Sequence, residues 1–459
     1  MSSLFRAKVA VARAMGVISR RSGRGGGTTI PGRVLLRFAP DAVERLGRGL
    51  PASSTIVSAT NGKTTTAAMI AAALRAAGRE PVHNRAGSNM TWGVATALLE
   101  QRGEEGLFEV DEAWLPKVAS DLEPRLIVLG NLFRDQLDRY GELETLADEW
   151  AKLVAARAGR TGFVLNADDP LIADLGRDRE LRRRPGVTYF GIDDPTHALA
   201  ELQHAHDAKH CRRCGAPYAY ARAFVGHLGH YSCPDCEADR PSPDVVAERI
   251  DLHGMRGSTV SVRTPEGPVQ LDLPFPGLYN VYNALAALAA ALRLGVPLPT
   301  AAEGLSATQA AFGRVETIEV EGTPVSILLI KNPAGANEVL RTVRLEDADG
   351  EGLDLWIALN DGIADGRDVS WVWDADFELL AGSVRSVVCA GTRAPEMAVR
   401  LKYAGIDPAA ITVEEAVGRS LDRAVAGSER HLYALPTYTA LLELRTLLAS
   451  RGLAREYWA

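Results

Sequence analysis

Short runs of β-branched and aromatic residues alternate with helical patterns between Thr55 and Tyr189. The runs TIVSAT, LFEV, RLIVLGN and GFVLNA predict strands, and helical patterns follow them over 64–77, 112–119 and 143–156 and again after the fourth run. Parallel strands need a crossover segment between them, which is usually a helix. The alternation therefore predicts an α/β fold built on a parallel sheet.

The alternation stops between about Glu201 and Glu248, in a segment rich in His and Cys that ends near the loop sequence RPSP. Two strand-like runs, STVSVR and PVQLDL, and a helix over 280–294 resume the pattern, and a second α/β pattern runs from about 315 to the end. We therefore predict a basic helix and linker (1–50), a nucleotide-binding central domain (51–312) with an insertion at about 201–248, and a C-terminal α/β domain (313–459). Gly313 and Arg314 mark the boundary.

Composition narrows the class of protein. The chain has 459 residues, of which 46% are hydrophobic and 24% charged, as in ordinary globular proteins. A net charge of -7 argues against a general polyanion binder. No apolar run approaches the roughly 18 residues that a membrane helix needs. We expect a soluble, cytoplasmic protein.

The charge of the N-terminus differs from that of the whole chain. The first 37 residues carry eight basic side chains and no acidic one. A secretory signal would have an apolar run after its basic residues, but Arg20-Arg21 is followed by SGRGGG. We favour a cytoplasmic helix and linker. A segment that touches anionic lipid at the inner face of the membrane is the alternative.

The first predicted strand leads into TNGKTTT and then an alanine-rich helix, which is the order that a phosphate-binding loop requires. Backbone N–H groups would hold phosphate oxygens, Lys63 would reach the β- and γ-phosphates, and the Thr64 hydroxyl would ligate Mg²⁺. The match is incomplete, since Val57 stands where the general pattern has glycine. The alternative is a polar helix cap with an exposed lysine. The candidate nucleotide ligands in this loop are Thr60, Asn61, Gly62, Lys63, Thr64 and Thr65.

Three acidic residues, Glu109, Asp111 and Glu112, lie at the end of the next predicted strand. Ligands of α/β sheets bind at the carboxyl ends of the strands, so these residues are placed to hold Mg²⁺ or to orient an acceptor. A solvated acidic loop is the alternative.

Four of the five cysteines form two C-x-x-C pairs separated by 18 residues, namely Cys211, Cys214, Cys233 and Cys236. This spacing predicts a closed four-thiolate zinc site with a structural role. Nothing indicates the oxidising compartment that disulfides need, and His210 or His230 remain possible substitute ligands. A zinc ribbon also suggests nucleic-acid binding, but residues 201–244 carry five Lys/Arg against six Asp/Glu and therefore lack a basic face. We expect the fifth cysteine, Cys389, to be a buried structural thiol.

Several motifs then point to one family. The runs TNGKTTT, EVDEA, NLFRDQLDRYG, VLNADDP, GLYNVYNALAA and FGRVE resemble, in this order, the Mur ligases and folylpolyglutamate synthetases. The runs KNPAGANEVL, LNDGIADGRDVSWVWDADFE, GTRAPEMAVRLKYAG and LPTYTALLELR resemble the MurT family, the synthetase subunits of lipid II isoglutaminyl synthases. The chain departs from the Mur pattern at three places. Ala59 replaces a glycine, residues 135–141 lack both of the usual histidines, and Lys331 replaces a histidine where it would steer an anionic substrate.

The resemblance implies an ATP-dependent carbon–nitrogen ligase. ATP would phosphorylate the α-carboxylate of D-glutamate in the lipid II stem peptide, and ammonia from a GatD-type glutaminase partner would displace the phosphate to give D-isoglutamine. Asn280 and Asn283 would contact the nucleotide base, Arg314 would face the phosphates, and Glu109 would join Thr64 at Mg²⁺.

One aspartate of this subunit would complete the partner's Cys-His pair. The candidates are Asp361, Asp365, Asp368, Asp374 and Asp376. We favour Asp374, with Asp368 second. The alternative function is a Mur-type or folylpolyglutamate-type ligase that joins an amino acid to a carboxylate.

Overall fold

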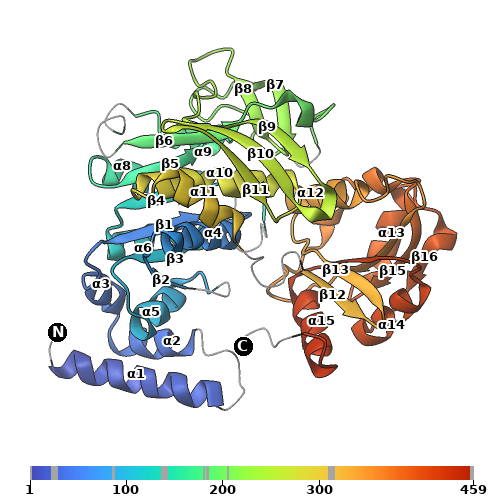
Figure 1. The fold of residues 1–459 in the computed structure, drawn as a ribbon, viewed down its shortest axis with the longest axis horizontal. Helices are drawn as coiled ribbons and strands as arrows, with labels where there is room; N and C mark the ends of the chain where they lie inside the picture. The colour runs from blue at the N-terminus through green and yellow to red at the C-terminus, as the bar shows by residue number, and fades with distance from the viewer. Residues whose placement is uncertain are drawn as a thin grey trace.

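The structure is a computed structural model that describes residues 3–21, 29–84, 88–135, 143–178, 181, 186–203, 206–308 and 316–454. The chain forms a nine-stranded sheet, a six-stranded sheet and a separate two-stranded sheet. Helices cover both faces of the two larger sheets (Figure 1). The predicted α/β fold with two α/β units and an insertion is confirmed. Within the described residues no helix has the length and apolar character to cross a membrane.

The nine-stranded sheet has the order β11-β10-β9-β6-β5-β4-β1-β3-β2. Its pairs from β2 to β9 are parallel, while β9, β10 and β11 pair antiparallel. The sheet is thus mixed, because a two-residue turn joins β10 to β11 where a parallel pair would need a crossover. The strands are β1 (Ser54–Ser58), β2 (Val82–His83), β3 (Gly106–Glu109), β4 (Leu126–Leu129), β5 (Gly162–Asn166), β6 (Val187–Ile192), β9 (Val245–Leu252), β10 (Ser258–Thr264) and β11 (Gly267–Leu273).

Successive residues of a strand point to opposite faces, so β1 buries Ile56 and Val57 in different cores. One face carries α4 (Lys63–Ala76), α10 (Leu278–Arg293) and α11 (Leu298–Ser306). The other carries α5 (Thr91–Glu100), α6 (Leu115–Leu122), α8 (Leu143–Arg157) and α9 (Pro170–Leu175). The helix predicted from residue 112 begins at Leu115, with Pro116 in its first turn, where a proline's missing N–H costs nothing.

Three N-terminal helices pack beside α5 at the edge of the molecule. They are α1 (Ser3–Arg21), α2 (Ile30–Phe38) and α3 (Ala42–Gly47). Phe5, Val9 and Ala12 of α1 form a small core with Leu35 and Leu99. The basic N-terminal helix predicted from the sequence is therefore a packed element of the fold. Figure 1 shows α1 as the outermost helix on this side.

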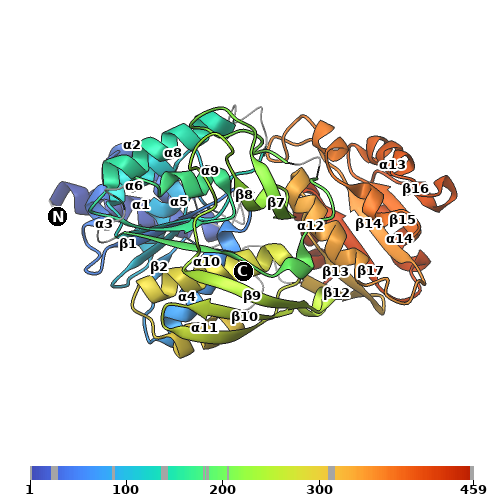
Figure 2. The same ribbon diagram turned by 90° about the horizontal axis from the view of Figure 1, so that it is seen from above.

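The insertion contains β7 (Ala219–Val225) and β8 (Leu228–Ser232), an antiparallel pair outside the two large sheets. A 3₁₀ turn, η2 (Pro195–His197), precedes it. In Figure 2 the pair lies between the nine-stranded sheet and α12 (Pro333–Arg344). Arg341 of α12 donates a hydrogen bond of 2.7 Å from Nη1 to the Phe224 carbonyl, so the insertion also contacts the C-terminal unit.

The six-stranded sheet has the order β12-β13-β17-β14-β15-β16, with only the β12–β13 pair antiparallel. Helices α12 and α13 (Ala394–Tyr403) cover one face, and α14 (Val417–Gly427) and α15 (Tyr438–Ser450) cover the other. The strands are β12 (Glu316–Val320), β13 (Thr323–Ile327), β14 (Leu353–Ala358), β15 (Val384–Ala390), β16 (Ile411–Val413) and β17 (Leu432–Pro436). The predicted boundary at Gly313 and Arg314 lies outside the described residues.

Candidate active site

The loop between β1 and α4 turns sharply at Gly62. Its φ of +89° lies in the left-handed region that favours glycine. A Cβ atom at this position would lie 1.9 Å from Oδ1 of Asn283, which is far shorter than a van der Waals contact between carbon and oxygen. Asn283 accepts a hydrogen bond of 3.3 Å from the Thr66 hydroxyl. The turn therefore requires glycine, and Asn283 of α10 holds the start of α4 against it.

Two further asparagines fix the loop. The Asn61 N–H donates to Asn131 Oδ1 at 2.9 Å, and Asn131 Nδ2 donates to the Asn61 carbonyl at 3.0 Å. The side-chain amides of Asn61 and Asn332 bond to each other at 3.0 and 3.2 Å. Asn332 caps α12, so the C-terminal unit contacts the loop directly. Sequence analysis does not single out Asn131, although a polar residue directly after a buried strand is a signal for this position.

Lys63 is buried, with 7% of its surface exposed, which argues against the alternative of a helix cap with an exposed lysine. Its ammonium donates to Glu112 Oε2 at 2.7 Å and to the Ala59 carbonyl, because the first turn of α4 folds the side chain back over the loop. Burial alone lowers the pKa of Lys63, but Glu112, Asp111 and Glu109 together raise it above its ordinary value. Lys63 therefore keeps its positive charge at the site.

A second lysine comes from the C-terminal unit. The Lys331 ammonium donates to the Thr60 carbonyl at 3.2 Å and to the Asp135 carboxylate. Burial raises the pKa of Glu112, but the charges of Lys63 and Lys331 bring it below its ordinary value. The site thus gathers two cations and several carboxylates around one loop.

Two oxygens at this edge of the sheet lack a partner. Thr64 Oγ1 and Glu109 Oε2 are buried and have no hydrogen-bond partner among the residues that the structure describes. Glu109 ends β3, in register with Val57 of the neighbouring β1, while Thr64 lies in the first turn of α4. Buried polar atoms are nearly always paired, and hydroxyl and carboxylate oxygens are the ligands that Mg²⁺ prefers. The two side chains fit the predicted magnesium role.

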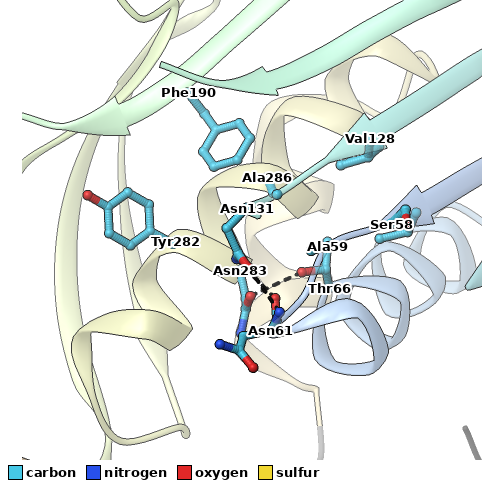
Figure 3. A pocket seen from close by; sticks show the side chains of 12 residues that line it. Ser58, Ala59, Asn61, Thr66, Val128, Asn131, Phe190, Tyr282, Asn283 and Ala286 are labelled. Atoms are coloured by element: carbon cyan, nitrogen blue, oxygen red, sulfur yellow. Dashed lines mark hydrogen bonds between the residues drawn. The ribbon is translucent and has the colours of Figure 1, made fainter. Parts of the chain in front are cut away.

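A small pocket opens behind the loop (Figure 3). Phe190 and Tyr282 form an aromatic wall, and Asn61, Asn131 and Asn283 form the polar side. The other lining residues are Val57, Ser58, Ala59, Thr66, Val128, Gly130 and Ala286.

The remaining predicted nucleotide ligands are spread around this pocket. Asn280 accepts a bond of 3.0 Å from Asn283 Nδ2 and donates one of 2.8 Å to the Pro276 carbonyl. Thr60 accepts a bond of 3.0 Å at Oγ1 from the Phe133 N–H. Thr65 is buried in α4, and Arg314 lies outside the described residues. Asn283 therefore positions the loop and Asn280 supports Asn283, and these structural roles do not depend on a bound nucleotide.

The four cysteines of the insertion converge as the spacing predicts. Their sulfur atoms all lie within 4.8 Å of one another, with Cys214–Cys233 at 3.4 Å and Cys211–Cys236 at 3.6 Å. Burial would raise the pKa of Cys211, but the backbone N–H groups of Cys214 and Arg213 lower it to about 6. Four thiols that meet in this way have the geometry to hold one metal ion. The two histidines considered as substitutes are not part of this group.

The insertion is tied to the pocket wall. Arg240 Nε donates to Asp168 Oδ1 at 2.7 Å, and the Tyr282 hydroxyl donates to Asp168 Oδ2 at 2.7 Å. The Gly229 N–H, at the start of β8, donates to the Asp168 carbonyl at 2.8 Å. His227, fully buried, packs its ring 4.7 Å from the ring of Phe133. The insertion therefore braces the segment that follows β5 and the loop that follows β4.

Three of the five candidate aspartates are engaged within the C-terminal unit. Asp361 accepts from the Thr392 hydroxyl at 2.8 Å, Asp365 from the Thr439 N–H at 2.8 Å and Asp376 from Asn337 Nδ2 at 2.8 Å. Asp368 is exposed and caps a turn by accepting the Ser370 N–H at 2.8 Å. Asp374 is half-exposed and lies 3.5 Å from Arg134 of the central unit.

Cys389 is buried as expected, and burial raises the pKa of its thiol to about 12.

Comparison with known proteins identifies the class. Residues 57–232 match the Mur ligase middle domain. Among solved structures, the pseudomurein peptide ligase type C from Methanothermus fervidus superposes with a TM-score of 0.67 at 22% identity, over 89% of this chain and 80% of that one, and so shares the fold. Together with the loop and its lysine, this defines an ATP-dependent ligase of the Mur type.

The rest of the chain places it more narrowly. Residues 329–441 match the MurT ligase C-terminal domain. A Streptococcus pneumoniae protein named as subunit MurT of lipid II isoglutaminyl synthase (glutamine-hydrolyzing) is 34% identical over 94% of both chains. A Staphylococcus aureus protein of the same name is 30% identical over 90% of this chain and 91% of its own. The chain belongs to the MurT family.

We predict that Gly62→Ala lowers the kcat/KM for ATP turnover by roughly tenfold or more, because displacement of the loop by a Cβ misplaces the phosphate-binding groups. Steady-state ATP hydrolysis measures the effect. Gly159→Ala is the matched control, since Gly159 also has a positive φ, of +75°, but no atom lies within 4 Å of its Cβ position. Equal losses of kcat/KM in the two variants would mean that backbone strain at a left-handed glycine causes the loss. The contact of the added Cβ with Asn283 would then contribute nothing.

Proposed function

We propose that this chain is the synthetase subunit of a glutamine-dependent amidotransferase that amidates the α-carboxylate of D-glutamate in the lipid II stem peptide. Membership of the MurT family carries the proposal, since relatives named for this activity align over nearly the whole chain. The residues around the β1–α4 loop supply the groups that such a reaction needs. Because the reaction consumes ATP, which is present in the cytoplasm, it takes place on the cytoplasmic side of the membrane.

A carboxylate becomes electrophilic only when one of its oxygens is made a leaving group. The terminal phosphoryl group of ATP passes to a carboxylate oxygen, with a new O–P bond formed and the bond to ADP broken. Transfer between two anions needs positive charge at the transferred group. Lys63 and the backbone N–H groups at the start of α4 present it, and Lys331 adds a second cation from the C-terminal unit.

Thr64 and Glu109 would hold the Mg²⁺ ion, which when bound neutralises charge on the phosphates. Glu112 keeps Lys63 in place through its 2.7 Å ion pair. Asn61 bonds the loop to Asn332 of the C-terminal unit. The loop is therefore held in position when the C-terminal unit packs against it. Asn280, Asn283 and Arg314 remain proposed nucleotide contacts.

Ammonia then attacks the acyl carbon of the acyl phosphate. The C–N bond forms, the C–O bond to phosphate breaks, and the nitrogen loses a proton to give the amide. Ammonia carries no side chain to recognise, so this step requires no pocket for an amino acid. A conventional Mur-type ligase would require one.

We further propose that a GatD-type glutaminase binds to the C-terminal unit as a heterodimer and supplies the ammonia. Trp373 and Tyr403 are exposed, with ring centroids 5.9 Å apart, and Ile363 and Val399 add exposed apolar surface nearby in the chain. Exposed aromatic side chains are frequent at the centres of protein interfaces. Asp374 follows Trp373 directly, and its side chain is 44% exposed beside its ion pair with Arg134, which supports its role beside the partner's histidine.

The ion at the four cysteines is zinc in this proposal. Two knuckles of two thiolates each fill all four positions of a tetrahedron and leave none open for catalysis. The ribbon then acts through its contacts with Asp168 and Phe133, which lie beside the pocket.

We predict that this chain with ATP, Mg²⁺ and ammonium converts a lipid II stem peptide from acid to amide without the partner. Tandem mass spectrometry detects the amide and locates it on the α-carboxylate. Lys63→Arg keeps the ion pair to Glu112 but replaces the ammonium, and it should lower the rate on the order of a hundredfold. Consumption of ATP with an added amino acid, but without amide formation, would instead indicate the conventional ligase class.

We predict that Asp374→Asn impairs glutamine-driven amidation by the complex at least about tenfold while ammonium-driven amidation is retained, because the side chain orients a histidine in the partner. Both rates are measured on the same complex. Asp368→Asn is the matched control. A selective loss in the Asp368 variant alone would transfer the role to that residue, and equal losses in both assays would remove Asp374 from the glutaminase site.

We predict about one zinc ion per chain by elemental analysis. Cys214→Ser should abolish zinc binding and lower the melting temperature, because it removes one of the four metal ligands. Cys214 is exposed, so the substitution disturbs little packing. Cys389→Ala, outside the cluster, should retain the metal. A folded wild-type protein without metal and with four titratable thiols would contradict the zinc assignment.

A further inference from the structure

Helix α1 has two apolar faces, of which only one is packed. The packed face contains Phe5, Val9 and Ala12. A second stripe, formed by Leu4, Val11, Met15 and Ile18, is between 40% and 67% exposed. Its spacings of 7, 4 and 3 residues place these side chains on one line along the helix. Single exposed apolar residues are common on protein surfaces, but a continuous stripe along a whole helix indicates an interaction site.

The stripe is held in a defined position on the outside of the molecule. The Arg13 guanidinium donates to the Leu99 carbonyl at the end of α5, at 2.7 and 3.0 Å, and the Lys8 ammonium donates to the Phe38 carbonyl. Phe38 is itself 52% exposed and lies next to this contact. Figure 1 shows α1 along the rim, with the packed side toward α2 and α5. The exposed stripe therefore faces away from the protein.

The charge of α1 indicates which kind of partner the exposed apolar stripe binds. Helix α1 carries five basic residues and no acidic one, and the first acidic residue of the chain is Asp41. Two copies of α1 packed on each other would bring like charges together, which disfavours a homodimer through this face. A surface of anionic lipid matches both features, since apolar side chains enter the acyl region and the net positive charge of the helix is attracted to the headgroups. The helix lacks the apolar length to cross the bilayer.

We propose that α1 docks this chain on the surface of an anionic membrane, with Leu4, Val11, Met15 and Ile18 inserted at the acyl boundary. The helix lies in the plane of the surface, because its other apolar face remains packed on α2 and α5. This docking is independent of the proposed amidation. It keeps the enzyme at the surface where a lipid-linked acceptor is held and leaves the chemistry to the distant β1–α4 loop.

The test is co-sedimentation of the full chain with vesicles of phosphatidylcholine alone or with about one third phosphatidylglycerol. We expect binding to the anionic vesicles that is at least about tenfold stronger than to the neutral ones, and that weakens at about 0.5 M salt. The double variant Val11→Glu/Ile18→Glu should lower partitioning into anionic vesicles by at least about tenfold. Arg6→Gln, which leaves the apolar stripe intact, should lower it several-fold.

Val413→Glu is the matched control, because Val413 is similarly exposed but belongs to β16 in the six-stranded sheet. It should bind vesicles as the wild type does. All variants should keep the wild-type melting temperature and the same ammonium-driven amidation of a soluble stem peptide, so that a failed amidation assay and a failed docking assay are separate results. Equal vesicle binding by the wild type and the stripe variant would overturn the proposal.

Two other outcomes would also overturn it. A wild-type dimer in sedimentation velocity that the stripe variant dissolves would assign the face to a second copy of this chain. Loss of vesicle binding when a glutaminase partner is added would assign it to that protein.

Discussion

The turn between β1 and α4 is the constraint on which the rest of the site depends. A phosphate-binding loop must bring backbone N–H groups and a cation to one point, and here the chain does so through a left-handed glycine at residue 62. Such a conformation persists only where the surroundings fix it. Asn131 in the loop after β4, Asn283 in α10 and Asn332 at the N-cap of α12 do this. Three asparagines from distant parts of the chain therefore make one short loop rigid.

The buried charges impose a second dependence. A buried ion pair is stable only while both partners and their hydrogen bonds are present, and removal of one leaves an uncompensated charge. Lys63 and Glu112 form such a pair inside the central unit, and Lys331 adds a positive charge from the other unit that also acts on Glu112. The electrostatics of the site are thus complete only when both units are in contact. A loop in one unit and a lysine in the other therefore form one electrostatic cluster.

How far the sequence predicted this arrangement depends on the range of the interaction. The strand before Thr60, the helix after Gly62 and the convergence of Cys211 to Cys236 follow from local periodicity and spacing, and the structure has all three. The burial of Lys63 was not predicted, since it depends on the ion pair with Glu112, which is 49 residues away. Asn131 was missed and Asn332 was given no contact with the loop, because their bonds span 70 and 271 residues. Nothing in a local pattern specifies such pairs.

The four-cysteine cluster illustrates how a structural element outside the β1–α4 loop is connected to it. The four cysteines fold a segment that has few hydrophobic contacts of its own. That fold positions Arg240, which pairs with a fully buried Asp168. The same carboxylate accepts the Tyr282 hydroxyl at the pocket wall, one residue before the asparagine that contacts the loop at Gly62. A buried carboxylate that loses its cation is left with an uncompensated charge, so the loss of Arg240 would disturb the bond from Asp168 to Tyr282. The insertion is therefore part of the scaffold that shapes the pocket beside the β1–α4 loop.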